Sequence, residues 1–274
     1  MVDHIGGKVV IVTGAAKGFG RLVCEKAAAR GAKVVAADID AAGLSEVAAA
    51  IPGALTVTAD VTRLGDLQAA AAKAVEAFGA IDVIVNNAGI MPLGFYADHA
   101  LGAEAWSRCI DINIKGVLNG IMAVHDQMIA QGRGQVINIS SIYGNFPVAG
   151  AAVYGATKSA VTFLSEALRV ESQGKIKVTT IRPTGVPATN LGSGVVNPAA
   201  IVGILGQNTA SYLATMQALA GNEAPAGARD PESIAYAALE PQYIADAIIH
   251  AIDQPWGVSV SDITVRATGD GYIL

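Results

Sequence analysis

Short apolar runs alternate with longer alanine-rich stretches along most of this chain, and this alternation constrains the fold more than any other feature. The first run, at residues 9–12, reads Val-Val-Ile-Val without a polar residue. Strands that are apolar on both sides are typical of a parallel sheet covered by helices on both faces. Strand and helix segments that follow one another predict βαβ units with right-handed crossovers. We therefore expect one α/β domain over residues 1–274, built as a doubly wound parallel sheet.

The predicted elements can be placed from the same pattern. Strands are expected at residues 9–12, 33–38, 54–58, 81–85, 135–139, 177–181 and 262–265. Helices are expected at residues 19–30, 41–50, 63–78, 103–131 (two helices or a bent one), 153–172 and 242–253, with a helix pair near 199–219. Residues 184–240 are too many for an ordinary connection. We interpret them as an insertion that forms a lid and orders on binding, so that ligands should slow its cleavage by proteases.

Composition excludes several classes of function. Hydrophobic residues make up 52% of the 274 residues and the mean hydropathy is +0.45, but no apolar stretch approaches the roughly 18 residues that span a membrane. A net charge of −5 without a basic block argues against nucleic acid as a partner. Two cysteines in helical segments, Cys24 and Cys109, and no secretory leader predict a cytoplasmic protein with reduced core thiols. The four histidines are scattered, so we expect no metal site.

A glycine-rich turn joins the first predicted strand to the first predicted helix. Residues 13–20 read Thr-Gly-Ala-Ala-Lys-Gly-Phe-Gly. Gly14 permits a tight turn, Gly18 lets the backbone approach a pyrophosphate, and Gly20 allows the helix to pack closely on the strand. An anion would then lie on the free N–H groups of the helix N-terminus. The position of this turn predicts a dinucleotide site rather than a simple loop.

An acidic residue ends the second strand and bears on the choice of cofactor. Asp38 lies 24 residues after Gly14, where a carboxylate can accept hydrogen bonds from both adenosine ribose hydroxyls and would repel a 2′-phosphate. Lys17 in the glycine turn favours the opposite choice, since it could meet that phosphate. We give Asp38 more weight and predict NAD as the cofactor in preference to NADP.

Two further strand ends carry polar residues. Asp60 and Val61 follow the third strand, where the carboxylate could hold the adenine amino group or simply cap the next helix. Asn87, Ala88 and Gly89 follow the fourth strand and suit either a cofactor that passes over the sheet edge or a polar turn.

A tyrosine and a lysine follow the fifth strand at helical spacing. Ser141 comes after that strand, and Tyr154 and Lys158 lie 13 and 17 residues further on. Residues four apart share one helix face, and an ammonium group beside a phenol lowers the pKa of the phenol. Tyr154 and Lys158 are therefore candidates for acid/base chemistry near neutral pH. Tyr143 lacks such a partner, because its fourth position is Pro147.

Taken together, these motifs resemble those of the classical short-chain dehydrogenases/reductases. Residues 13–20 are similar to the family's TGxxxGxG turn, and residues 86–89 read as its NNAG motif. Asn113, Ser141, Tyr154 and Lys158 fall at the positions of its catalytic tetrad, in the same order and spacing. The resemblance extends over essentially the whole chain and implies a Rossmann-type fold.

The resemblance also implies roles. Tyr154 would exchange the alcohol proton, Ser141 would hydrogen-bond the substrate oxygen, Lys158 would lower the Tyr154 pKa and bind the nicotinamide ribose, and Asn113 would support a water linked to Lys158. At residues 182–189 the sequence differs from the family, with Pro183-Thr184 in place of Pro-Gly. The implied cofactor contacts are Gly14, Lys17, Gly18, Phe19, Gly20, Asp38, Ile39, Asp60, Val61, Asn87, Ala88, Gly89, Tyr154, Lys158, Pro183, Thr184, Val186 and Thr189. A homotetramer or homodimer is implied as well.

The segments that surround the substrate in this family are mostly apolar here. We predict that the substrate contacts Met91, Ile142, Tyr143, Phe146, Leu191 and Leu205, although such side chains could instead form core or a subunit contact. The leading hypothesis is an NAD-dependent oxidoreductase that acts on a bulky hydrophobic secondary alcohol or ketone. The alternatives are an NADPH-dependent carbonyl reductase and, less favoured, a non-catalytic dinucleotide sensor.

Overall fold

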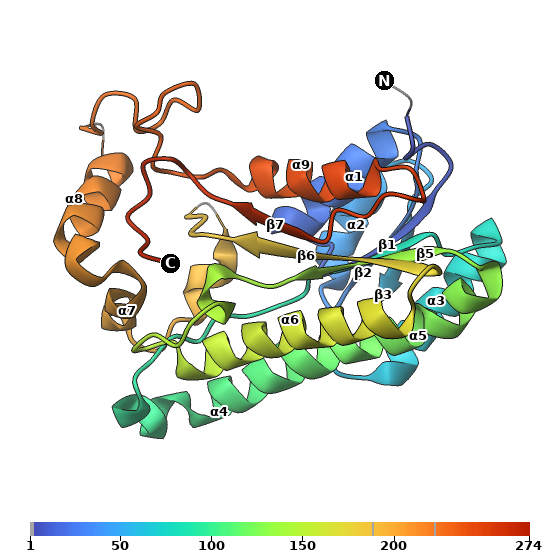
Figure 1. The fold of residues 1–274 in the computed structure, drawn as a ribbon, viewed down its shortest axis with the longest axis horizontal. Helices are drawn as coiled ribbons and strands as arrows, with labels where there is room; N and C mark the ends of the chain where they lie inside the picture. The colour runs from blue at the N-terminus through green and yellow to red at the C-terminus, as the bar shows by residue number, and fades with distance from the viewer. Residues whose placement is uncertain (1–2, 188, 222) are drawn as a thin grey trace.

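A seven-stranded parallel sheet forms the centre of the computed structural model, which describes residues 3–187, 189–221 and 223–274 (Figure 1). The strand order in this described part is β3-β2-β1-β4-β5-β6-β7, so the chain winds outward from β1 in both directions. This order confirms the predicted doubly wound sheet. The strands are β1 Val9–Thr13, β2 Lys33–Asp38, β3 Leu55–Thr58, β4 Val83–Asn86, β5 Gly134–Ile139, β6 Ile176–Pro183 and β7 Asp262–Val265.

Helices cover both faces of the sheet, which is why the central strands are apolar throughout. All five residues of β1 are buried, and alternate residues face two different core clusters. Val10 and Val12 pack with α1 (Gly18–Ala29), α2 (Ala41–Ala50) and α9 (Pro241–Ile252). Val9 and Ile11 pack on the other face with α3 (Leu64–Phe78), α5 (Gly116–Gln131) and α6 (Ala152–Glu171). Cys24 and Cys109 are both free and buried, as predicted.

The long helical region predicted at residues 103–131 consists of two helices joined without a break. Helix α4 (His99–Ile110) runs through a π-helical turn at Asp111–Lys115 into α5. Such a turn carries one extra residue and often marks a functional position. Here it contains Asn113, whose side chain is fully buried.

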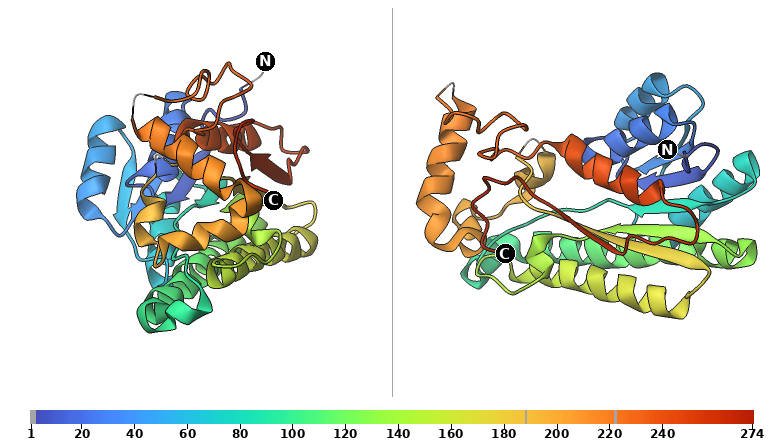
Figure 2. Two further views of the ribbon diagram at one scale, coloured as in Figure 1. Left: turned by 90° about the vertical axis from the view of Figure 1, so that its left-hand side faces the viewer. Right: turned by 45° about the horizontal axis from the view of Figure 1, so that its top comes forward.

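The insertion stands beyond the carboxyl ends of the strands. It contains the short helix α7 (Val202–Leu205) and α8 (Thr209–Ala220), close to the helix pair that was predicted. Figure 2 shows both helices at one end of the molecule, with the C-terminal segment alongside. Ala200, Ile204 and Leu205 anchor the insertion in a third apolar cluster, whereas α8 has no buried residue. No helix in the described residues is long and apolar enough to cross a bilayer.

Candidate active site

A large cavity lies between the carboxyl ends of the strands and the insertion. Its volume is about 1190 Å³, and parallel sheets of this kind place their ligands at the same edge. Ser141, Tyr154 and Lys158 line it, whereas Asn113 lies behind its wall. All of the predicted cofactor residues except Gly20 line it: Gly14, Lys17, Gly18, Phe19, Asp38, Ile39, Asp60, Val61, Asn87, Ala88, Gly89, Tyr154, Lys158, Pro183, Thr184, Val186 and Thr189.

The three glycines of the turn have different physical roles. Gly14 and Gly18 have φ angles of +64° and +57°, which only glycine adopts without strain. A Cβ at Gly20 would clash with the Gly14 carbonyl oxygen, so Gly20 serves helix–strand packing and does not line the cavity. A Cβ at Gly18 would meet no atom within 4 Å. Gly18 therefore presents bare backbone to the cavity at the N-terminus of α1, whose first amides have no partner within the helix.

The Asp38 carboxylate is held in place by the backbone. It accepts hydrogen bonds from the N–H groups of Ala16 and Asp40, each at 2.9 Å. The Lys17 ammonium lies 3.8 Å from Asp40. This arrangement fixes an acidic group on the cavity wall and pairs the turn's only lysine with a different carboxylate.

Asp60 and Asn87 line the cavity but also have structural tasks. Asp60 accepts hydrogen bonds from the backbone N–H and the hydroxyl of Thr62, at 2.9 and 2.8 Å, within the turn before α3. The N-cap of α3 is Arg63, so Asp60 does not cap that helix. The Asn87 amide donates to the carbonyl oxygens of Thr13 and Gly14, at 2.9 and 3.1 Å. Asn87 therefore shapes the glycine turn across the sheet.

Tyr154 and Lys158 lie side by side on α6, and both are buried. The Lys158 ammonium is 5.7 Å from the centre of the Tyr154 ring and donates to the Ile139 carbonyl oxygen at 2.8 Å. Burial lowers the pKa of Lys158 to about 8. Burial also raises the pKa of Tyr154, and a hydrogen bond with Ser141 opposes that rise only in part. Desolvation is the largest cause of this rise, and a lowering of the Tyr154 pKa by Lys158 stays a prediction.

The Asn113 side chain forms hydrogen bonds within the protein, behind the cavity wall. Its Nδ2 donates to the Ile90 carbonyl oxygen at 3.0 Å and to Thr157 at 3.1 Å, and its Oδ1 accepts from the Ile90 N–H at 3.0 Å. These contacts tie the π-helical turn to α6 and to the segment after β4. A Cβ at Gly89 would lie 3.3 Å from Asn113 Oδ1 and 3.6 Å from Lys158 Nζ, so Asn113 and Lys158 meet behind this glycine.

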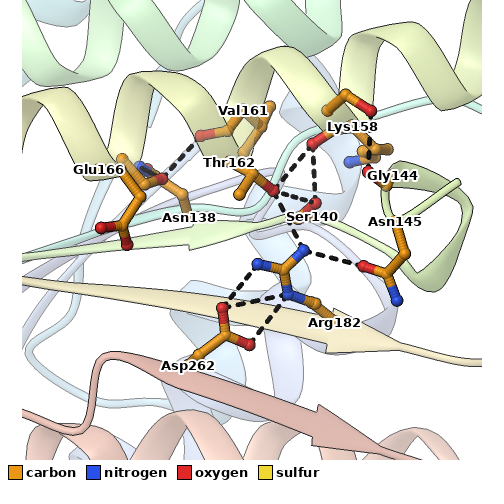
Figure 3. A network of polar contacts seen from close by, with 12 residues as sticks. Asn138, Ser140, Gly144, Asn145, Lys158, Val161, Thr162, Glu166, Arg182 and Asp262 are labelled. Carbon is orange, nitrogen blue, oxygen red and sulfur yellow. Dashed lines mark hydrogen bonds and ion pairs between the residues drawn. The ribbon is translucent and has the colours of Figure 1, made fainter.

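A polar network below the site connects α6 to the sheet (Figure 3). The Ser140 hydroxyl donates to the Lys158 carbonyl oxygen at 2.9 Å, which joins the end of β5 to α6. Arg182 pairs with Asp262 at 2.6 Å and donates to Asn145 at 2.9 Å. Arg182 does not line the cavity, so its charge serves the scaffold and not an anionic substrate.

Half of the predicted substrate residues are placed wrongly. Met91, Tyr143 and Leu191 line the cavity. Ile142 and Leu205 instead belong to the third core cluster. The turn at Ile142–Gly144 buries Ile142, and the short helix α7 buries Leu205. Phe146 is 64% exposed and does not line the cavity.

The structure adds lining residues that the sequence pattern did not indicate. Tyr272, near the C-terminus, reaches the cavity, and no periodicity marks its segment as part of a site. Thr62, Gly185 and Pro187 also line the cavity without having been predicted.

The wall of the cavity suits a dinucleotide. At one end lie the bare backbone of Gly18 and the fixed Asp38 carboxylate. At the other end, the buried Thr184 hydroxyl has no hydrogen-bond partner among the described residues, as expected of a group that meets a polar ligand. Within residues 3–187, 189–221 and 223–274, no cluster of His, Cys, Asp or Glu could hold a metal ion.

Comparison with known proteins gives consistent matches. A family model described as short chain dehydrogenase matches residues 8–198. An uncharacterized oxidoreductase of Listeria monocytogenes is 36% identical over 272 residues, which cover 98% of this chain and 99% of that protein. A 2,5-dichloro-2,5-cyclohexadiene-1,4-diol dehydrogenase of Sphingobium indicum is 38% identical over 191 residues, or 68% of this chain and 76% of its own. The structure of a 3-ketoacyl-(acyl-carrier-protein) reductase from Brucella melitensis, complexed with NADH, matches with a TM-score of 0.76 and 26% identity, over 97% of this chain and 99% of that one.

Proposed function

The chain belongs to the short-chain dehydrogenase family, and from that premise we propose that it transfers a hydride between NAD(H) and a bulky hydrophobic secondary alcohol or ketone. One observation carries this proposal. A single cavity has Ser141, Tyr154 and Lys158 on its wall together with the glycine turn and the Asp38 carboxylate. A dinucleotide held by the turn would therefore reach the hydroxyl groups that act on a substrate oxygen.

The chemistry assigned to the chain's own residues is proton transfer and charge stabilisation. In oxidation the Tyr154 phenolate, formed by loss of its own proton to solvent, takes the alcohol proton, and in reduction the Tyr154 hydroxyl donates its proton to the substrate oxygen. Ser141 donates a hydrogen bond to the substrate oxygen as charge develops there. Lys158, with a pKa of about 8, exchanges its proton near neutral pH beside the Tyr154 ring. The nicotinamide ring supplies or accepts the hydride when it is bound.

The fixed carboxylate of Asp38 supports NAD over NADP. A 2′-phosphate next to this carboxylate would meet a like charge, and like charges at close range are costly. Lys17 faces Asp40, so the cation that could offset this repulsion is already paired. The alternative of an NADPH-dependent carbonyl reductase has less support for this reason.

The apolar side chains on the substrate side support a hydrophobic substrate. Met91, Leu93, Leu191, Val195 and Ile201 line that part of the cavity. The relative from Sphingobium indicum is a dehydrogenase of a cyclic diol by its name, which is consistent with a cyclic alcohol here. A non-catalytic sensor is the less favoured alternative, because such a protein has no need of the complete group of Ser141, Tyr154 and Lys158.

We further propose that the protein is cytoplasmic and forms a homodimer or homotetramer through the outer faces of α5 and α6. Phe163 on α6 is 77% exposed, and Val170 on α6 and Met122 on α5 are exposed as well. Large exposed apolar side chains on neighbouring elements are typical of subunit contacts. Light scattering should give a mass of two or four chains, and a monomer at micromolar concentration would contradict this part of the proposal.

The experiment that tests the proposed function is a panel of cyclic, aromatic and aliphatic secondary alcohols offered with NAD or NADP. We expect NADH to form with at least one bulky alcohol and NADP to be the poorer oxidant. Turnover of no member with either cofactor would overturn the assignment as a dehydrogenase. A clear preference for NADP would favour the carbonyl reductase instead.

A further inference from the structure

Two tyrosine hydroxyl groups meet at the substrate end of the cavity. Tyr212 comes from α8 in the insertion and Tyr272 from the C-terminal segment, 60 residues later. Their hydroxyl oxygens are 2.9 Å apart and their ring centres 5.5 Å apart. Both residues line the same cavity as Ser141 and Tyr154. Neither had been assigned a chemical role by the proposed reaction.

The C-terminal segment that carries Tyr272 is held by several independent contacts. The Arg266 side chain donates to the Tyr272 carbonyl oxygen at 2.9 Å and pairs with Asp270 at 2.6 Å. The Ile273 N–H donates to the Ile204 carbonyl oxygen at 3.0 Å, which joins the segment to α7. Tyr272 is therefore held by protein contacts alone, and a preformed polar group gives specificity at little ordering cost.

The pair is connected to the reacting end of the cavity through one aromatic ring. A Cβ at Gly185 would clash with the Tyr272 hydroxyl oxygen, so this hydroxyl sits directly on the backbone that follows β6. Tyr143 bridges the remaining distance, because its ring packs edge-on against Tyr154 at 5.5 Å. Tyr143, Tyr212 and Tyr272 pack in the same apolar cluster and line the same cavity. The wall thus runs from the catalytic hydroxyl across one ring to the pair.

Hydrogen-bond accounting shows what the pair can still bind. Two hydroxyl groups have two protons, and the bond between them uses one. In the described residues neither oxygen has another hydrogen bond from a side chain or backbone, so one O–H donor and further lone pairs remain. Burial and the neighbouring Tyr212 raise the pKa of Tyr272, which keeps this phenol protonated at neutral pH. Such a group suits an uncharged oxygen better than a carboxylate or a phosphate.

We propose that the Tyr212–Tyr272 hydroxyl pair binds a second oxygen atom of the substrate, remote from the carbon that is oxidised. The inference rests on the proposed function and narrows its substrate class to alcohols or ketones that carry a further hydroxyl or carbonyl group on an apolar body. The apolar wall holds the body, Ser141 and Tyr154 hold the reacting oxygen, and the tyrosine pair holds the second one. A site that hydrogen-bonds a substrate hydroxyl also discriminates against analogues that lack it.

The test compares cyclohexanol with cyclohexane-1,2-diol, 1,3-diol and 1,4-diol, with NAD as oxidant. Wild-type protein should show a kcat/KM for at least one diol that exceeds that for cyclohexanol by about 3- to 10-fold, the usual worth of one hydrogen bond. Tyr212→Phe and Tyr272→Phe should each remove this preference, chiefly by raising KM for the diol, and should lower kcat/KM for cyclohexanol much less than for the diol. The control variant Tyr243→Phe removes a hydroxyl outside the cavity and should change kcat/KM for neither cyclohexanol nor the diols.

The outcomes separate this inference from the proposed function. Equal losses on cyclohexanol and on the diols would mean that the pair only latches α8 to the C-terminal segment, and would overturn the inference. Turnover of all four alcohols without a diol preference would also overturn it while the proposed function stood. If the protein oxidises only other secondary alcohols, diol binding can be measured by thermal shift in the presence of NAD. Diol binding that neither substitution weakens would also overturn the inference and leave the proposed function standing. No turnover of any alcohol would overturn both.

Discussion

Replacing Gly18 by alanine adds a methyl group where the backbone faces the cavity. The added Cβ would meet no protein atom within 4 Å, so the folded chain suffers no clash. Its φ of +57° does impose strain on an L-residue, worth about 1–2 kcal/mol. In a domain of this size that cost lowers Tm by roughly 2–8 °C. The fold should therefore survive.

Cofactor binding should suffer much more than stability. If the dinucleotide phosphates approach the bare backbone at Gly18, the methyl group displaces them from the amides of the first turn of α1. Loss of one charge-assisted hydrogen bond costs about 1.5–3 kcal/mol, so the Kd for NAD should rise by roughly 10- to 100-fold. The measurement is a calorimetric titration with NAD, alongside a thermal melt.

A second glycine provides the matched control. Gly53 also has a positive φ, of +88°, with no atom within 4 Å of an added Cβ, and it lies in the loop between α2 and β3, outside the cavity. Gly53→Ala should lose a similar amount of stability and bind NAD as wild type does. The reasoning is refuted if Gly18→Ala binds NAD normally, or if both variants lose affinity alike.

Two further predictions concern charged groups. Asp38→Ala should weaken NAD binding by roughly tenfold or more, as hydrogen bonds to a charged group are lost, and should improve NADP binding; titrations in which NADP binding falls would contradict our interpretation of Asp38. The second variant, Lys158→Met, tests how stability depends on pH. The pKa of Lys158 is about 8 in the folded protein and about 10.5 in the unfolded chain, so the stability of the wild type rises with pH between these values. The Met variant should therefore gain most in Tm relative to wild type at pH 7 and lose that advantage by about pH 10. A Tm difference that does not change with pH would count against a buried, charged Lys158.

The sheet and the side of the cavity formed by the glycine turn and Asp38 could be predicted, because short stretches of sequence determine both. A buried parallel strand is apolar on both faces, and β1 ends directly at the glycine turn. The packing role of Gly20 follows from its spacing to Gly14, as the structure confirms. Asp38 lies on the cavity wall because the carboxyl ends of parallel strands share one edge of the sheet.

The substrate side could not be predicted in the same way, since long-range contacts determine it. Ile142 and Tyr143 are adjacent and both belong to the third core cluster, but only Tyr143 also lines the cavity. The short turn that contains them has no simple period. Tyr272 reaches the cavity only because Arg266 and α7 hold the C-terminal segment. The spacing of Tyr154 and Lys158 identified them as neighbours, but burial, which spacing does not report, sets the directions of their pKa shifts.

The central claim is that Tyr154 exchanges a proton with an alcohol whose hydride passes to NAD. The most direct test measures NADH formation from the best alcohol of the panel by wild type and by Tyr154→Phe, with NAD affinity measured for both. General acid–base catalysis contributes about 10²- to 10⁴-fold. We predict a loss of that size in kcat for Tyr154→Phe with a Kd for NAD within about fivefold of wild type, the worth of one neutral hydrogen bond. A variant that forms NADH as fast as wild type would contradict the account.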